Sequence, residues 1–332
     1  MAINLDDIQP NVVTPNVADK IWLFYGEMGT RKTSVACRFP NHIMFSYDIG
    51  YKLINGAMAV PMQSWVDFKS AVKQLDKQSN KDKFKVVIID TVGQAYQACY
   101  NYVLTQNSAS EPGEIGAFGM GWKKIRNEFE TTLGSICRKG YGLVMLAHSD
   151  EVEKEDKVSK KKVTSVKIDI DRRPDLIIKG LADFVFFLHK EPTDNNPEEP
   201  TVYAYNKLID IDTKTRSRYF SNRFEFTYEN LQKELEIAVQ KQYQAENLSM
   251  PDSFIINNPY MTGAINFNEI LQETRQLAQL LVDKGYIDAV NETLLTVFQG
   301  VSLSELTETE DNIEKIQVVY TTFDELKTKA RI

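Results

Sequence analysis

Nine consecutive residues near the start of the chain have the types and the spacing that bind nucleotide phosphates. They follow the apolar run 21–25 and are Gly26, Glu27, Met28, Gly29, Thr30, Arg31, Lys32, Thr33 and Ser34. A phosphate-binding loop has a glycine, four other residues, a second glycine, a lysine, and then a serine or threonine. Arg31 occupies the position of that second glycine. The segment therefore predicts nucleotide binding, and Arg31 leaves hydrolysis open.

The chemistry of such a loop gives a role to its last polar residues. Backbone N–H groups converge on the phosphates, and the N-terminus of the following helix adds positive potential. Lys32 is expected to reach the β- and γ-phosphates of ATP, and the hydroxyl of Thr33 to bind Mg²⁺. Positive φ, which the missing glycine would normally allow, costs an ordinary residue about 1–2 kcal/mol. Arg31 must avoid that conformation or tolerate it, and its guanidinium either adds charge near the phosphates or crowds them.

Two further apolar runs should end at the same edge of a sheet as the loop. The run 84–91 is rich in β-branched residues and predicts a buried parallel strand with Asp90 at its tip. Open α/β sheets bind ligands at that edge, so Asp90 is predicted to hold Mg²⁺ directly or through water, although alone it could simply cap a turn. The strand 142–147 leads to His148, which either senses the γ-phosphate or is a hydrogen-bonded structural residue. A fourth strand is predicted over 182–188.

The pattern along the chain predicts two domains. With 332 residues and 42% hydrophobic content, the chain can form one large core and a small satellite. We expect an α/β, RecA-like P-loop core over 1–246, with a mostly parallel sheet flanked by helices and an N-terminal arm at 1–17. A polar connector at 247–262 then leads to an all-helical domain at 263–332, whose apolar stripes should form its own core.

The remaining composition excludes several classes of protein. Three cysteines, Cys37, Cys99 and Cys137, are far apart and the three histidines are scattered, so neither a disulfide framework nor a zinc site is indicated. No apolar stretch has the length of a membrane span, and no signal-like segment precedes the first strand, so we expect a cytoplasmic protein without membrane contact.

Basic residues form local groups although the net charge is −7, which argues against indiscriminate coating by nucleic acid. The segment 151–167 alternates lysines with acids, and it is either a solvated hairpin or loop, or a DNA-binding element. Its candidate DNA contacts are Lys157, Lys160, Lys161, Lys162 and Lys167. A later group could complete a neighbouring subunit's nucleotide site or be an exposed, salt-bridged surface, and its candidates are Lys207, Arg216 and Arg218.

Six ordered segments together resemble one protein family. They are 26–34, 47–52, 64–65, 87–91, 119–122 and 146–149. In this order they resemble bacteriophage RecA-like P-loop ATPases, the phage nucleotide-binding proteins that are associated with single-strand annealing recombinases. The resemblance covers residues 18–240. It implies a core that forms a homo-oligomer with ATP between subunits, engages single-stranded DNA, and assists phage recombination or replication in the host cytoplasm.

The resemblance also implies roles for individual residues. Lys32 and Thr33 match the phosphate and Mg²⁺ ligands, and Asp90 matches the second metal-associated carboxylate. Asp48 stands where the family usually has glutamate, the base that orients the attacking water. An aspartate would stand back from that water by more than about an ångström, which is enough to slow turnover. Arg31 and Asp48 are therefore two departures from the family pattern that leave nucleotide binding intact.

Two other functions are compatible with the same loop. One is a nucleotide-dependent interaction or assembly protein that hydrolyses ATP weakly or not at all and does not bind DNA; Arg31, Asp48 and the acidic composition favour it. The other is a small-molecule kinase, but the sequence has neither an arginine-rich lid nor an acceptor pocket. The helical domain loosely resembles C-terminal extensions that dock phage or host recombination or replication proteins.

Overall fold

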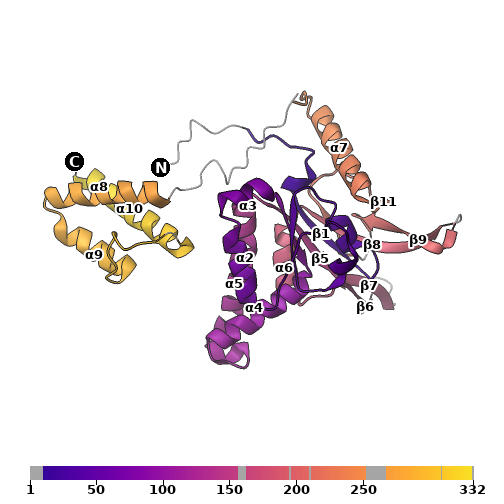
Figure 1. The fold of residues 1–332 in the computed structure, drawn as a ribbon, viewed down its shortest axis with the longest axis horizontal. Helices are drawn as coiled ribbons and strands as arrows, with labels where there is room; N and C mark the ends of the chain where they lie inside the picture. Colours follow the sequence, from indigo (N-terminus) through magenta and orange to yellow (C-terminus); the bar gives the residue numbers. More distant parts are fainter. Residues whose placement is uncertain are drawn as a thin grey trace. The chain divides into compact units, whose positions relative to one another are not determined.

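A computed structural model describes residues 10–155, 162–193, 196–208, 211–251, 267–307 and 309–330. These residues divide into two compact units, which we call the core unit (11–251) and the helical unit (267–330) (Figure 1). The predicted domain boundaries remain a prediction, because residues 1–9 of the arm and 252–266 around the connector lie outside the described residues.

The core unit is built on a mixed, mostly parallel sheet. Its strands are β1 (Ile21–Gly26), β2 (His42–Ser46), β3 (Ala59–Pro61), β4 (Val86–Asp90), β5 (Gly142–Ala147), β8 (Phe184–Thr193), β9 (Asn196–Tyr205), β10 (Lys214–Thr215) and β11 (Arg223–Glu225). The order is β11-β9-β8-β1-β5-β4-β2-β3, and β10 pairs with β8 outside this path. From β8 to β3 every pairing is parallel, whereas β9, β10 and β11 add antiparallel pairings. The expected α/β class, with a mostly parallel sheet flanked by helices, is confirmed.

The central strands are apolar on both faces because helices cover both. In β1, Leu23 and Tyr25 join one hydrophobic cluster while Trp22 and Phe24 join the other. The first cluster is covered by α2 (Trp65–Gln74), α4 (Val92–Gln106), α5 (Met120–Arg138) and α6 (Arg172–Leu181). The second is covered by α1 (Lys32–Ala36) and α7 (Tyr228–Ala245), which lies on the other side of the sheet (Figure 1).

Two projections extend from the core unit. One is the antiparallel hairpin of β6 (Ser149–Glu155) and β7 (Lys162–Ile168), which follows β5. The other is the connection between α4 and α5, which contains the short 3-10 helix η4 (Pro112–Ile115). In Figure 1 the hairpin lies at the lower right of the core unit and the α4–α5 end lies at its lower left. Shorter helices η2 (Val17–Asp19), η3 (Gly50–Leu53) and α3 (Gln78–Lys83) complete the described core unit.

The helical unit consists of α8 (Phe267–Asp283), α9 (Ile287–Phe298) and α10 (Glu310–Ala330). The predicted stripes are its own core: Leu281 from α8 and Ile316 and Phe323 from α10 are fully buried in one cluster. No helix among the described residues of either unit is long and apolar enough to cross a membrane.

Candidate nucleotide site

The carboxyl ends of four parallel strands bring the predicted site residues to one edge of the sheet. In the register of the sheet, Tyr25 of β1 lies beside Ala147 of β5, Asp90 beside Leu146, and Ser46 of β2 beside Asp90. The residues that follow these strand ends are therefore neighbours although the chain separates them widely. This edge is where open α/β sheets bind their ligands.

The loop closes around the ammonium group of Lys32. Its Nζ donates to the carbonyls of Gly26 at 2.8 Å and Glu27 at 2.9 Å, and to the hydroxyl of Thr30 at 3.1 Å. Burial lowers the pKa of Lys32 to about 8; the neighbouring charge of Asp90 opposes this shift and that of Lys190 adds to it. The lysine is thus held inside the loop at the start of α1.

Arg31 tolerates the left-handed conformation that the missing glycine would have adopted. Its φ is 58° and its ψ is 21°, and it is the N-cap residue of α1. No side-chain hydrogen bond caps the helix there, and the arginine side chain is exposed. The backbone therefore takes up the left-handed conformation without a glycine, and the arginine is exposed whereas the lysine that follows it is buried.

Thr33, at the start of α1, and Asp90, at the end of β4, are in direct contact. The threonine hydroxyl donates to Oδ2 of Asp90 at 2.8 Å. Burial raises the pKa of the Asp90 carboxyl, as does the charge of Asp48, whereas the Thr33 hydrogen bond and the nearby Lys32 and His148 lower it. The two residues that the sequence proposed as Mg²⁺ ligands are therefore in direct contact.

Asp48 is attached to Asp90 through the backbone. The N–H groups of Tyr47 and Asp48 both donate to the carbonyl of Asp90, at 2.7 and 3.3 Å. Oδ1 of Asp48 accepts a hydrogen bond from the N–H of Ile49 at 2.6 Å, which leaves the second carboxylate oxygen for other partners. A carboxylate is thus fixed beside the Thr33–Asp90 pair.

His148 follows β5 at the same edge. Its Nδ1 is buried and has no hydrogen-bond partner among the described residues. Buried ring nitrogens of histidine are normally paired, so an unpaired one at a ligand edge suits a residue that gains its partner when a ligand binds. The structure brings Lys32, Asp48, Asp90 and His148 together at this edge.

Sequence reasoning missed one cation of the loop, Lys190. The strand predicted over 182–188 continues as β8 to Thr193, and Nζ of Lys190 donates to the carbonyl of Met28 at 2.8 Å. The preceding residue, His189, places Nδ1 3.7 Å from a carboxylate oxygen of Glu27. No local signal marks these residues, because the polar sequence after Leu188 is typical of a strand end.

Within the described part of the chain, no contact brings another of the basic candidates to the nucleotide edge. Lys157, Lys160 and Lys161 lie outside the described residues, while Lys162 and Lys167 lie in β7, with Lys167 opposite Asp150. Lys207 is exposed, Arg216 pairs with Asp183 at 3.3 Å, and the guanidinium of Arg218 lies over the ring of Tyr219. These contacts fit the alternative of an exposed, partly salt-bridged surface.

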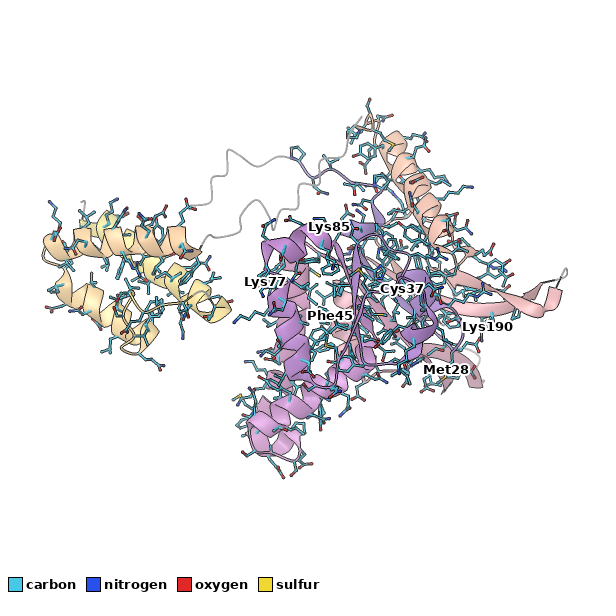
Figure 2. All side chains as sticks on the ribbon, viewed as in Figure 1. Met28, Cys37, Phe45, Lys77, Lys85 and Lys190 are labelled. Carbon is cyan, nitrogen blue, oxygen red and sulfur yellow. The ribbon has the colours of Figure 1, made fainter. Side chains whose placement is uncertain are left out.

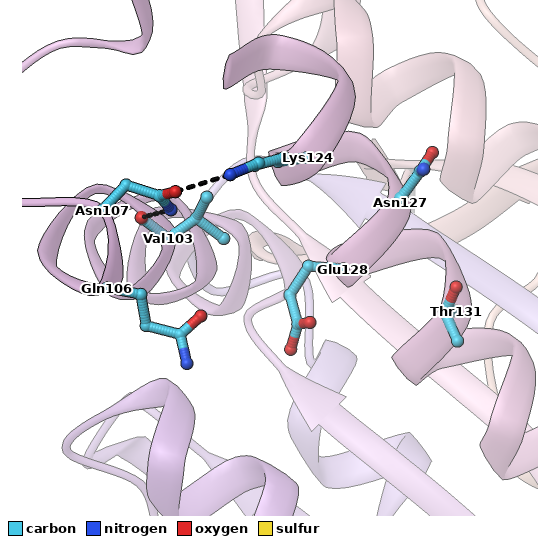
Figure 3. Close-up of a pocket in the computed structure, with 7 residues that line it drawn as sticks. All are labelled: Val103, Gln106, Asn107, Lys124, Asn127, Glu128 and Thr131. Carbon is cyan, nitrogen blue, oxygen red and sulfur yellow. Dashed lines mark hydrogen bonds between the residues drawn. The ribbon is translucent and has the colours of Figure 1, made fainter. Parts of the chain in front are cut away.

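A separate polar hollow of about 500 Å³ lies between α4 and α5 (Figure 3). Lys124 donates to Asn107 across it at 2.6 Å, and Glu128 accepts from Trp65 at 2.8 Å. None of the loop residues lines this hollow, so it is distinct from the nucleotide edge.

The residues at the edge fit ATP with Mg²⁺. Among the described residues, the N–H groups of Gly29, Thr30, Arg31 and Lys32 have no hydrogen-bond acceptor, as a phosphate cradle requires. No group of three or more His, Cys, Asp or Glu side chains gathers around a metal position in the described part of the chain. Mg²⁺ in nucleotide sites needs only one or two protein oxygens besides phosphate and water, and Thr33 and Asp90 provide two.

Comparison with known proteins agrees with this geometry. Residues 18–226, which include the whole nucleotide edge, match the AAA domain family. The chain belongs to this family. Membership means that its core unit is a P-loop, AAA-type ATPase domain, which implies nucleotide binding.

The chain is also similar to one prophage protein and to one solved structure. The chain is 26% identical over 340 residues to the SPbeta prophage-derived uncharacterized protein YorG of Bacillus subtilis strain 168, with 98% of each chain covered. Among solved structures it is similar to the RadB recombinase, at 10% identity and a TM-score of 0.33, over 57% of this chain and 80% of the recombinase.

Proposed function

We propose that this chain is an ATP- and Mg²⁺-dependent phage ATPase that forms a homo-oligomer and acts on single-stranded DNA in recombination or replication. The observation that carries the nucleotide part is the contact of Thr33 with Asp90 directly beside the loop lysine. The prophage origin stated for the relative in Bacillus subtilis supports a role in phage genome metabolism.

In the proposed reaction, each residue at the edge has a distinct task. Lys32 neutralises charge on the β- and γ-phosphates, and Thr33 and Asp90 hold Mg²⁺, which lowers the negative charge that an attacking water must approach. Asp48 accepts a hydrogen bond from that water and orients it, and His148 detects the γ-phosphate through its unpaired Nδ1. The aspartate in place of glutamate makes turnover slow.

The DNA part of the proposal is supported by an exposed aromatic residue near basic side chains. Phe118, in the connection between α4 and α5, is fully exposed and has a φ of 56°. Lys123 and Lys124 follow it and are also exposed. Aromatic rings that stack on bases, beside cations that contact phosphates, are the usual elements of single-strand binding. The β6–β7 hairpin, in which Lys167 lies opposite Asp150, is the second candidate DNA-binding projection.

The competing function is a nucleotide-dependent assembly protein without DNA contact. Arg31 and Asp48 favour weak hydrolysis, and the helical unit could dock a phage or host recombination or replication protein. This alternative predicts ATP binding without turnover and without any response to DNA.

ATP hydrolysis at low salt, with and without single-stranded DNA, separates the two functions. We expect slow turnover that DNA stimulates, no turnover by Lys32→Ala, and ATP binding without turnover by Asp48→Asn. Normal turnover in both variants would remove the site assignment. ATP binding by the wild type without hydrolysis would favour the assembly protein.

DNA binding is tested independently of turnover. Phe118→Ala should weaken single-stranded DNA binding about tenfold, within the ~1–3 kcal/mol of a base–aromatic stack. Neutralising Lys160, Lys161 and Lys162 should weaken it further and flatten its salt dependence. Val66→Ala, which truncates an exposed side chain on α2, is the matched control. Unchanged affinity in both variants would remove these two projections from the DNA site.

A further inference from the structure

Strand β8 extends beyond the end of β1 and lies alongside the phosphate-binding loop. The last pair between the two strands is Gly26 with Leu188, and β8 continues to Thr193. In this extension Nζ of Lys190 donates to the carbonyl of Met28 at 2.8 Å. Figure 2 shows Lys190 and Met28 at the same side of the core unit. A residue outside the loop motif therefore holds the middle of the loop.

The ammonium group of Lys190 also lies close to the next loop residue, Gly29. A Cβ atom on Gly29 would lie 2.9 Å from Nζ of Lys190, and Gly29 has a φ of +75°. Glycine is therefore favoured at this position by the backbone conformation, whereas the flexible end of the lysine could shift to make room for a Cβ. The end of the Lys190 side chain therefore lies beside both Met28 and Gly29 of the loop.

Holding the Met28 carbonyl also directs the next N–H group. The peptide between Met28 and Gly29 is trans, so its C=O and N–H point in opposite directions. Lys190 on the carbonyl oxygen therefore fixes the Gly29 N–H on the side away from the lysine. A cation on the carbonyl also polarises the peptide, which makes that N–H a stronger donor. Among the described residues, this N–H has no acceptor.

We propose that Lys190 is a positioning residue of the nucleotide site, which holds the Met28–Gly29 peptide so that its N–H donates to a phosphate beyond the α-phosphate. The assignment rests on the proposed nucleotide function. Lys32 reaches the phosphates from inside the loop, whereas Lys190 acts through the backbone from the neighbouring strand. The contribution of Lys190 therefore depends on the number of phosphates and is independent of the nucleoside.

Calorimetric affinities of ATP, ADP and AMP for the full chain test this role. Lys190→Met keeps the length of the side chain but removes the donor, and it should weaken ATP and ADP about tenfold, the lower range for a charged hydrogen bond, while AMP changes less than about twofold. Lys190→Arg keeps a charged donor and should restore ATP affinity to within about threefold of the wild type. The loss in Lys190→Met should persist at high salt, because a direct contact is screened little.

Lys85→Met is the matched control. Nζ of Lys85 also donates to a backbone carbonyl, that of Lys81 at 2.6 Å, and the residue is exposed at the opposite end of the core unit (Figure 2). It should bind all three nucleotides like the wild type.

Three outcomes would overturn the assignment. They are wild-type ATP affinity in Lys190→Met, an equal loss for AMP and ATP, and an equal loss in Lys85→Met. A wild-type chain that binds none of the three nucleotides would instead overturn the proposed nucleotide function, and the role of Lys190 with it.

Discussion

The hydroxyl of Thr33 donates to Oδ2 of Asp90 across 2.8 Å, although the two residues are 57 positions apart in the chain. Each belongs to a different motif, one at the start of a helix and the other at the end of a strand. Their contact turns two separate sequence patterns into one site of hard oxygen ligands, which is the kind of site that Mg²⁺ prefers.

Thr33→Val should remove the Mg²⁺ dependence of ATP binding. Valine has the shape of threonine without the hydroxyl, so the loop should keep its conformation but lose an oxygen ligand. We expect the ATP affinity of Thr33→Val in EDTA to differ from that of the wild type by less than about twofold. The increase in ATP affinity that Mg²⁺ gives the wild type should be lost in the variant. Calorimetry with and without Mg²⁺ measures both, and Thr33→Ser, which keeps the hydroxyl, is the control. An undiminished Mg²⁺ effect in Thr33→Val would contradict the assignment.

The buried charge of Lys32 should make the stability of the chain depend on pH. Burial lowers its pKa to about 8 in the fold, while the unfolded chain has a value near ~10.4. Between these values the unfolded state binds the extra proton, so stability increases with pH. Relative to Lys32→Met, the wild type should gain up to about 2 kcal/mol of unfolding free energy from pH 8 to pH 10.

Urea unfolding at a series of pH values checks this difference. Groups that titrate in both proteins cancel in the difference between their unfolding free energies. Lys85→Met, in which an exposed lysine is replaced, is the control, and its difference from the wild type should not change with pH. A difference between the wild type and Lys32→Met that does not change with pH would show that Lys32 remains charged in the fold.

Arg31 should accept glycine but not a β-branched residue. At a φ of 58°, Arg31→Gly relieves backbone strain but adds freedom to the unfolded chain, so stability should change by less than about 1 kcal/mol. Arg31→Val should destabilise by more than about 1–2 kcal/mol, because a branched Cβ fits this conformation worse. Urea midpoints compare the two variants, and equal midpoints would mean that the loop does not keep this conformation in solution.

Gly26 should be required for strand pairing as well as for phosphate binding. A Cβ at this position would lie 2.3 Å from the carbonyl oxygen of Leu188 in β8, and that backbone atom cannot move aside. Gly26→Ala should therefore destabilise by about 1–3 kcal/mol even without nucleotide. Gly180→Ala in α6, where nothing lies within 4 Å, should stabilise by about 0.5–1 kcal/mol. Thermal unfolding measures both variants, and equal changes in stability for Gly26→Ala and Gly180→Ala would contradict the role of Gly26 in strand pairing.

The sequence could predict the parts of the site that depend on local pattern. The spacing of Gly26, Lys32 and Thr33 and the apolar strand before Asp90 required no knowledge of distant contacts, and the parallel-sheet rule placed them at one edge. The roles assigned to these residues remain predictions, while the structure shows that they lie together.

Other parts depend on pairing that the sequence does not encode locally. Strand β8 continues through His189, Lys190 and Glu191, polar residues that usually mark a strand end, because β9 pairs with them. The position of Asp48 followed only from the family resemblance, since the short strand before it has polar residues at both ends. Its attachment to the Asp90 carbonyl is a tertiary contact.

The left-handed backbone at Arg31 bears on how such loops are recognised in genome sequences. What the fold requires at this position is a dihedral angle, and glycine is only the residue that reaches it most easily. A search that demands the second glycine will pass over chains of this kind, although their loops follow the same path. Describing the motif by backbone conformation, with arginine among the permitted residues, would recover them.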